Sequence, residues 1–182
     1  MSRIRPEWST GDHAVLALVT ETPRHGWALV RELAPDGEVG RVWTLSRALT
    51  YRAITKLADA DAIRPTRTEA GDGPRRTVYA ATAAGRRATD RWLAEPVVHL
   101  RDLRGDLLLK IVLSERRRID VGPLLAAQRR TLVPILAGLE RAARTPDADL
   151  VDLWRAESAR AVDRFLHAAG SVAASGTGGT AE

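Results

Sequence analysis

Two short segments of β-type sequence, residues 63–68 and 77–80, lie on either side of a glycine-rich turn. The turn is Ala70-Gly71-Asp72-Gly73-Pro74, and two such segments joined by a turn of this kind predict a β-hairpin. The chain around the hairpin shows helical patterns, three segments before it and one after it. This order predicts a winged helix-turn-helix, in which the third helix enters the major groove of DNA and the hairpin is the wing.

Capping residues and prolines mark the first, second and fourth helices of this region. We expect a first helix capped by Ser9 or Thr10 that ends near Pro23, and a short second helix near residues 25–33. Thr82 can cap a fourth helix, over residues 83–95.

The third helix has the clearest amphipathic pattern. Ser46 is its expected N-cap. The spacing i, i+3, i+4 and i+7 places four side chains on one buried face: Thr50, Ala53, Ile54 and Leu57. The same geometry turns most of the intervening polar residues outward.

Positive charge is concentrated in the same region. The chain has a formal net charge of +5, and residues 41–76 hold eight basic and four acidic residues, a net of +4. A local basic patch is typical of a surface that contacts phosphate. Arginine offers bidentate contacts to guanine or phosphate, and serine or tyrosine hydroxyls reach phosphate oxygens. The predicted DNA contacts are Ser46, Arg47, Tyr51, Arg52, Lys56, Arg64, Arg67, Arg75 and Arg76. The alternative for them is a solvated helix face with ordinary surface arginines.

The second half of the chain is helical by pattern. We expect helices over 103–114 and 123–144 and another that opens at Pro146, followed by a disordered tail over 170–182. A seam of Leu125, Leu132 and Leu139 and a stripe of Leu150, Trp154 and Phe165 should face each other and supply a dimer interface. The expected domains are a DNA-binding domain over 1–95, a helical dimerisation and effector domain over 96–169, and the tail. The predicted fold class is mainly α with a small β-hairpin.

Two stretches of the sequence resemble the PadR family of bacterial transcriptional regulators. The first is Ala14-Val15-Leu16-Ala17-Leu18 with Arg24-His25-Gly26-Trp27, and the second is Trp43-Thr44-Leu45-Ser46 with Tyr51-Arg52-Ala53-Ile54-Thr55-Lys56-Leu57. The second stretch continues through the wing sequence Gly73-Pro74-Arg75-Arg76 to Gly85-Arg86. Arg104-Gly105-Asp106-Leu107 is similar to the start of the longer C-terminal helical domain of one subgroup. The chain departs from the family at Ala48-Leu49-Thr50 and at Asp61, where the family has a glycine that ends the third helix.

The resemblance implies a homodimer on an inverted-repeat operator, which represses transcription and releases DNA on binding a small aromatic compound. It implies dimer contacts from the C-terminal helices. The candidate effector residues are Trp154, Arg155 and Arg160, because an aromatic acid could stack on the indole and pair with an arginine. Packing in the core or at the dimer interface is the alternative for Trp154, and core positions are expected for Trp27, Trp43 and Trp92.

Other functions find little support in the sequence. There are no cysteines, and the four histidines are scattered without metal-ligand spacing, so we expect no metal, cofactor or catalytic residues and no enzyme activity. The sequence shows no apolar run of a signal peptide or membrane span, which predicts a cytoplasmic protein without membrane contact. A winged helix that binds another protein rather than DNA is the second hypothesis.

Overall fold

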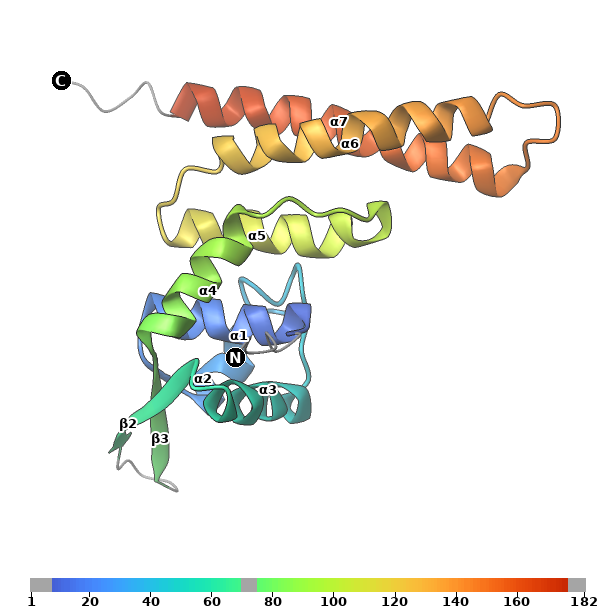
Figure 1. Ribbon diagram of the computed structural model, residues 1–182. Helices are drawn as coiled ribbons and strands as arrows, with labels where there is room; N and C mark the ends of the chain where they lie inside the picture. The colour runs from blue at the N-terminus through green and yellow to red at the C-terminus, as the bar shows by residue number, and fades with distance from the viewer. Residues whose placement is uncertain (1–7, 70–74, 177–182) are drawn as a thin grey trace, which may run out of the picture. The chain divides into compact units, whose positions relative to one another are not determined.

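The computed structural model describes residues 8–69 and 75–176, with the elements coloured in chain order in Figure 1. Its contacts divide the chain into two compact units, which we call the winged unit (residues 1–93 and 108–117) and the helical unit (94–107 and 118–182). Residues 108–117 thus pack with the N-terminal region, although the sequence analysis assigned them to the C-terminal domain. The predicted turn over 70–74 lies outside the described residues.

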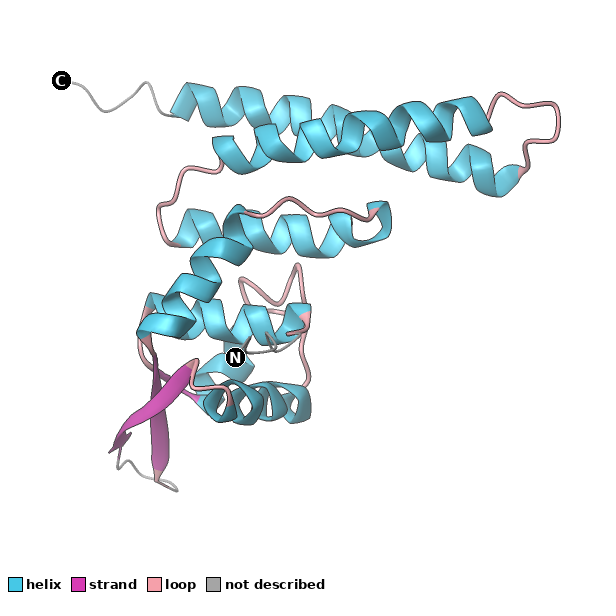
Figure 2. Cartoon of the chain, in the orientation of Figure 1, coloured by secondary structure: helices cyan, strands magenta, loops and turns pink. Residues whose placement is uncertain are grey.

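The winged unit has the predicted mainly helical fold with a β-hairpin. In chain order its elements are α1 (Thr10–Glu21), β1 (Arg24–His25), α2 (Gly26–Glu32), α3 (Arg47–Asp59), β2 (Ile63–Glu69), β3 (Arg76–Ala81), α4 (Ala83–Ala94) and α5 (Leu108–Arg116). The short strand β1 was not expected from the sequence. It extends the hairpin to a three-stranded antiparallel sheet in the order β1-β3-β2, drawn in magenta in Figure 2.

The predicted caps of three helices are confirmed, because each capping side chain accepts a hydrogen bond from a backbone amide that the helix itself leaves unpaired. Ser9 forms a reciprocal capping box with Asp12 at the start of α1. The Ser46 hydroxyl accepts from the Leu49 amide at 3.3 Å, and the Thr82 hydroxyl accepts from the Gly85 amide at 3.1 Å. Local sequence therefore sets where these helices begin.

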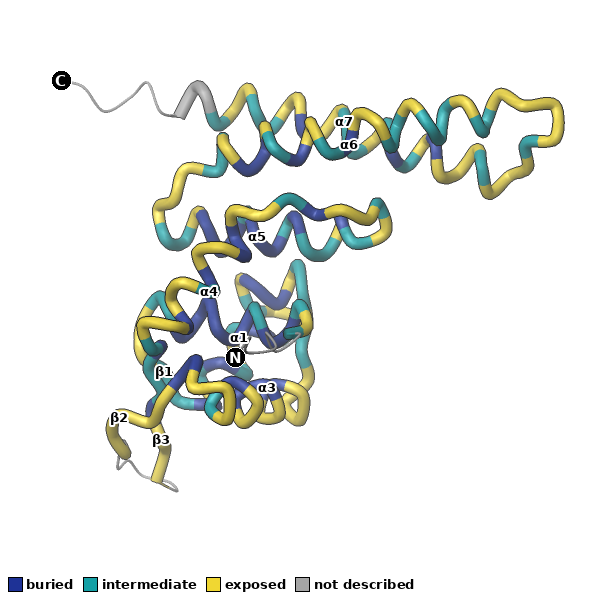
Figure 3. The backbone as a smooth tube through the Cα atoms, in the orientation of Figure 1, coloured by how far each residue is buried: buried dark blue, intermediate teal, exposed yellow. Residues whose placement is uncertain are grey.

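Helix α1 lies at the centre of the winged unit. Its residues 14–19 are all buried, because α3, β3 and α5 contact it from different sides. Figure 3 shows α3 buried along the side toward α1 and exposed along the opposite side. Helix α5 contributes Leu109, Val112 and Leu113 to the same core, which is why this segment belongs to the winged unit.

Helix α3 ends in a backbone turn that usually requires glycine. Asp61 has φ = 52°, the left-handed conformation. The Ala62 amide donates to the Leu57 carbonyl at 2.9 Å and the Asp61 amide donates to the Ala58 carbonyl at 3.0 Å, the two bonds of a Schellman motif. The departure from the family at Asp61 therefore leaves the glycine-type helix end in place, since aspartate tolerates this conformation better than most residues.

The helical unit contains two short turns and two long helices. The turns are η1 (Leu100–Asp102), a 3-10 turn, and η2 (Leu103–Leu107), a π-helical turn, and the long helices are α6 (Gly122–Ala142) and α7 (Leu150–Gly176), which pack side by side (Figure 1). Gln128 of α6 is buried and holds the backbone of Val97, since its amide accepts from the Val97 N–H at 2.7 Å and donates to the Val97 carbonyl at 2.8 Å.

Three expectations for α7 were wrong. The helix begins at Leu150 rather than at Pro146, because the Asp149 carboxylate accepts from the amides of Val151 and Asp152 and caps it there. Residues 170–176 are helical rather than disordered, since a long helix continues through small residues once it has formed; the rest of the predicted tail, 177–182, lies outside the described residues.

The third wrong expectation concerns the side of α7 that faces α6. The buried α7 side chains are Ala156, Ala159 and Leu166, opposite Leu125 and Leu132 of α6. The predicted stripe is exposed instead: Leu150 to 81%, Trp154 to 72% and Phe165 to 39%. Small residues at the contact let the two helices pack closely, so the larger apolar side chains of α7 remain outside it.

Candidate nucleic-acid interface

The outward side of α3 carries three of the predicted contact residues. Arg47, Tyr51 and Arg52 are exposed, whereas Thr50, Ala53, Ile54 and Leu57 are buried against the core, as the spacing predicted. Thr50 is buried without loss of hydrogen bonding, because its hydroxyl donates to the Ser46 carbonyl at 3.0 Å. The arginines are thus displayed by a helix whose opposite side is anchored in the core.

Two predicted contact residues of α3 have structural partners. The Ser46 hydroxyl caps the helix, and the Lys56 ammonium donates to the Asp12 carboxylate at 2.7 Å, which ties α3 to α1. Burial alone would raise the pKa of Asp12, but hydrogen bonds from Lys56 and Ser9 outweigh it and leave the pKa below its ordinary value. Lys56 therefore positions α3 in addition to any contact it makes outside the chain.

The remaining predicted residues lie on the wing strands or directly before β3, and all of them are exposed. Arg64 pairs with Ala80 and Arg67 with Val78, with a bulge between Pro65 and Arg67. Residues three positions apart on a regular strand point to opposite faces. The extra residue of the bulge changes this, so Arg64 and Arg67 lie on the same face of the hairpin as their partners Ala80 and Val78. Arg76 has the same parity on β3 as Val78 and Ala80, so it belongs to that face too. Arg75 directly precedes β3.

We call these exposed residues the basic face: Arg47, Tyr51, Arg52, Arg64, Arg67, Arg75 and Arg76. Within the described part of the chain, Arg47, Arg52, Arg64 and Arg76 form no ion pair with a carboxylate. An arginine without an internal partner keeps all its donors for an external anion.

Two other arginines of the winged unit, Arg24 and Arg116, are paired with carboxylates. The Arg116 guanidinium donates two bonds of 2.8 Å to the Glu21 carboxylate and also contacts Glu32 and Glu38. Arg24 bridges Glu21 and Glu32 at 2.9 and 2.8 Å. The hydrogen bonds that Arg116 donates to Glu21 raise the pKa of this guanidinium. This network joins α1, α2 and α5, whereas Arg47, Arg52, Arg64 and Arg76 have no carboxylate partner in the described ranges.

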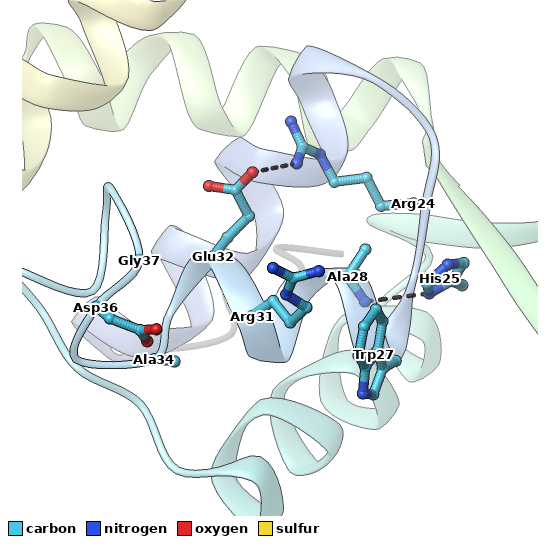
Figure 4. A pocket seen from close by; sticks show the side chains of 9 residues that line it. All are labelled: Arg24, His25, Trp27, Ala28, Arg31, Glu32, Ala34, Asp36 and Gly37. Atoms are coloured by element: carbon cyan, nitrogen blue, oxygen red, sulfur yellow. Dashed lines mark hydrogen bonds and ion pairs between the residues drawn. The ribbon is translucent and has the colours of Figure 1, made fainter.

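The sequence analysis missed two side chains beside the basic face. Trp27, expected in the core, is 45% exposed, and the guanidinium groups of Arg31 and Arg76 lie 5.1 and 5.3 Å from its ring centroid. A surface pocket of about 450 Å³ opens next to this ring and is bordered by His25, Arg31 and Glu32, shown with its other lining residues in Figure 4. The available signal was the Arg24-His25-Gly26-Trp27 motif, in which the His25 imidazole accepts from the Ala28 amide at 3.0 Å and caps α2.

The three predicted effector residues are not gathered into one site. Trp154 and Arg155 are exposed neighbours on α7, whereas the Arg160 guanidinium donates to Glu140 of α6 at 2.8 Å and to Glu157. None of the three lines the pocket beside Trp27 or a second one of about 500 Å³ between α6 and α7, which is bordered by Asp120, Arg129 and His167 among others. The assignment of an effector to these residues stays a prediction.

The described ranges contain neither a metal-binding cluster nor a membrane-spanning helix. Over residues 8–69 and 75–176, no group of three or more histidine or carboxylate side chains is arranged to hold a metal ion. In the same ranges no helix is both long enough and apolar enough to cross a membrane.

Comparison with known proteins identifies the winged unit. Residues 15–91 match the family model described as the transcriptional regulator PadR-like family. A Mycobacterium tuberculosis protein described as a probable transcriptional regulator is 31% identical over 96 residues, which are 53% of this chain and 50% of that protein. The chain thus spans about half the length of this curated relative.

Solved structures show a more distant likeness. Bacillus subtilis PadR in complex with operator DNA aligns with a TM-score of 0.45 at 18% identity, over 87% of this chain and 97% of that one. The same protein in complex with p-coumaric acid aligns with a TM-score of 0.41 at 16% identity, over 90% and 95%. The winged unit therefore carries a domain similar to the PadR-like family of transcriptional regulators over residues 15–91.

Proposed function

We propose that this chain regulates transcription by binding duplex DNA in a sequence-specific manner through the basic face. The observation that carries the proposal is the clustering of exposed arginines on α3 and on the wing, four of which lack carboxylate partners in the described ranges, unlike Arg24 and Arg116 of the same unit. Such a surface attracts phosphate, and its release of counterions makes binding depend strongly on salt.

The two parts of the basic face suit different contacts. Helix α3 presents Arg47 and Arg52 from an anchored helix, and a helix of this kind fits the major groove, where arginine reads guanine through two hydrogen bonds. The wing presents Arg64, Arg67 and Arg76 on one face of a hairpin, which suits contacts to the phosphate backbone. We assign sequence reading to α3 and positioning on the duplex to the wing.

A winged helix that binds only another protein is the competing function. Such a module does not require arginines on both the third helix and the wing, and protein interfaces are depleted of charge at their centre. The charge of the basic face therefore favours DNA.

The proposal includes a homodimer formed through the helical unit. Its support is the exposed apolar set on α7, where Leu150 and Val151 are each at least 60% exposed. Exposed apolar patches of this kind mark association surfaces. A two-fold dimer would place two α3 helices about 34–36 Å apart, one turn of an inverted-repeat operator.

The proposal further includes repression relieved by a small aromatic compound that stacks on the exposed Trp154 ring next to the Arg155 guanidinium. For release, the compound must favour a dimer geometry that does not fit the operator. Trp154→Leu should abolish the effect of the compound on a repressed reporter while leaving DNA affinity unchanged. A Trp154→Leu protein that no longer folds would instead assign this side chain to packing.

The test of DNA binding is selection of duplexes from a random-sequence library, followed by titrations of the selected duplex at several salt concentrations. Arg75→Ala with Arg76→Ala should weaken binding across all sequences and flatten the salt slope by about one unit for each phosphate that is no longer neutralised. Arg47→Ala or Arg52→Ala should relax sequence preference, at a cost of about 1–3 kcal/mol for each base that is no longer read.

The matched control removes two exposed arginines of α6, Arg130→Ala with Arg141→Ala, which changes the net charge by the same amount. It should leave the sequence preference unchanged and lower affinity only slightly. An equal loss of affinity in the control and in the wing variant would contradict the proposal, because general charge alone would then explain binding.

A further inference from the structure

The start of α2 touches both parts of the basic face. Trp27 contacts the wing, since the guanidinium of Arg76 lies 5.3 Å from the centroid of its ring. Arg31, one turn further along α2, lies 5.1 Å from the same centroid, and Figure 4 shows it beside the Trp27 ring. Both distances are within the range in which a cation is attracted to an aromatic ring.

Gly26, the residue before Trp27, is in contact with α3. A Cβ atom at Gly26 would lie 2.6 Å from Cε1 of Tyr51, closer than real Cβ atoms come to another atom, and a tight 3.1 Å from the hydroxyl oxygen. The ring of Tyr51 therefore occupies the space that a side chain at residue 26 would fill. The guanidinium of Arg47 lies 5.8 Å from the centroid of the Tyr51 ring, one helical turn away on α3.

The backbone at the start of α2 is itself held in place. The His25 imidazole accepts from the Ala28 amide at 3.0 Å, and His25 pairs with Val78 of β3 in the sheet. Gly26 and Trp27 are thus fixed to the strand that carries Arg76 and, through Tyr51, to the helix that carries Arg47.

We infer that Gly26 and Trp27 position the arginines of the basic face, and we call these two residues the seat. The Trp27 ring orders the side chains of Arg76 and Arg31. Gly26 leaves room for the Tyr51 ring, which in turn orders Arg47. The inference rests on the proposed function and adds Arg31 to the DNA-facing charges. A free arginine side chain loses rotamer freedom when it binds, so arginines that are already ordered lose less and bind more tightly.

The first experiment measures the seat without DNA. NMR relaxation of arginine side-chain N–H groups should show Arg76 more ordered than its neighbour Arg75 in the full-length protein. Trp27→Leu should make the two equally mobile, and Trp27→Tyr should restore most of the order because it keeps an aromatic ring. An Arg76 side chain as mobile in the wild type as in Trp27→Leu would overturn the inference.

The second experiment is a double-mutant cycle on a duplex selected by the wild-type protein from a random-sequence library. Trp27→Leu should weaken binding about two- to fivefold, the range expected for an exposed cation–ring contact. In a background of Arg31→Ala with Arg76→Ala it should have no further effect, because the residues that Trp27 positions are gone. An equal loss in both backgrounds would show that Trp27 acts independently of them and would overturn the inference.

Gly26→Ala tests the other half of the seat. Because its Cβ meets the Tyr51 ring, it should weaken binding in the wild type but much less in a Tyr51→Ala background. Equal losses in the two backgrounds would count against this role for Gly26. Thermal melts of every variant must show a folded protein for the comparison to be made.

The two experiments separate failure of the inference from failure of the proposed function. An ordered Arg76 in a protein that selects no duplex would contradict DNA binding alone. A mobile Arg76 in a protein that does select a duplex would contradict the seat alone.

Discussion

The central helix of the winged unit, α1, and the last helix of the helical unit, α7, differ in where their large apolar side chains lie. The six residues 14–19 of α1 are at most 2% exposed, whereas Leu150 and Trp154 of α7 are mostly in contact with solvent. The apolar side chains of α1 are therefore covered by other elements of the winged unit, and charged side chains lie on its surface. Helix α7 of the helical unit leaves large apolar side chains exposed, which is the observation behind the proposed association.

Charged groups show the same contrast. In the winged unit Arg116 is mostly buried and contacts three carboxylates, and in the helical unit Arg160 contacts two carboxylates at a more exposed position. Arg116 therefore helps to hold a core together, while the ion pairs of Arg160 are screened by water. The contrast between the two units can be tested by experiment, beginning with the change of largest expected effect.

Truncation tests whether the core of the winged unit needs α5. A fragment of residues 1–95 lacks α5 and so loses the buried side chains Leu109, Val112 and Leu113. At about 1.5–3 kcal/mol for each buried side chain, its stability should fall by roughly 5 kcal/mol or more relative to residues 1–117. Circular dichroism melts should show a cooperative transition for 1–117 and little folded structure for 1–95.

Light scattering on the longer fragment tests the other unit. Residues 1–117 lack α6 and α7, so this fragment should be monomeric while the full-length chain is dimeric. A dimeric 1–117 fragment, or equal melting points for the two fragments, would contradict the division of roles between the units.

The pH dependence of stability tests the burial of His13 in the winged unit. Its ring stacks on Trp92 at 4.7 Å, and burial together with the nearby charge of Lys110 lowers its pKa from 6.5 to about 4. The unfolded chain binds a proton below about pH 6.5 but the folded chain does not until about pH 4. His13 therefore adds no pH dependence above pH 6.5, and stability is lost as the pH falls toward 4, by up to about 3 kcal/mol.

Urea unfolding at pH 7, 6, 5 and 4.5 measures this loss. His13→Phe should make the profile shallower over this range. The prediction fails if His13→Phe keeps the slope of the wild type.

Removal of one arginine from each ion-pair cluster compares the units directly. Arg116→Ala should cost about 2 kcal/mol of unfolding free energy, because the partly buried carboxylates of Glu21 and Glu32 are then left with Arg24 as their one shared partner. Arg160→Ala should not shift the denaturation midpoint measurably. Equal losses for the two variants would show that the clusters do not differ as described.

The smallest effect concerns two non-glycine residues with positive φ. Asp61 in the winged unit has φ = 52° and Arg118 in the helical unit has φ = 56°. Glycine relieves backbone strain at such positions, so Asp61→Gly should stabilise the protein by about 0.5–1 kcal/mol, and Arg118→Gly should do the same. The strain is local, so urea unfolding should show a similar gain in unfolding free energy for both variants. A gain in only one of the two would show that the surrounding unit determines how much stability glycine adds.

The sequence determined the secondary structure of the winged unit almost completely. Thr50, Ala53, Ile54 and Leu57 repeat with the period of a helix, and Ser46 caps it, so both the helix and its buried side follow from neighbours in the chain. The outward position of Arg47 and Arg52 follows from the same periodicity. Strand β1 was missed, because two residues have no period and become a strand only by pairing with β3.

Tertiary structure alone decided which side chains meet. Lys56 pairs with Asp12, which is 44 positions away in the chain, and Arg116 pairs with Glu21, which is 95 positions away. Periodicity tells which side of a helix is buried but carries no information about the partner on another element. For the same reason the sequence showed Trp27 and Arg76 as separate residues, and only the pairing of β1 with β3 brought the ring and the guanidinium together.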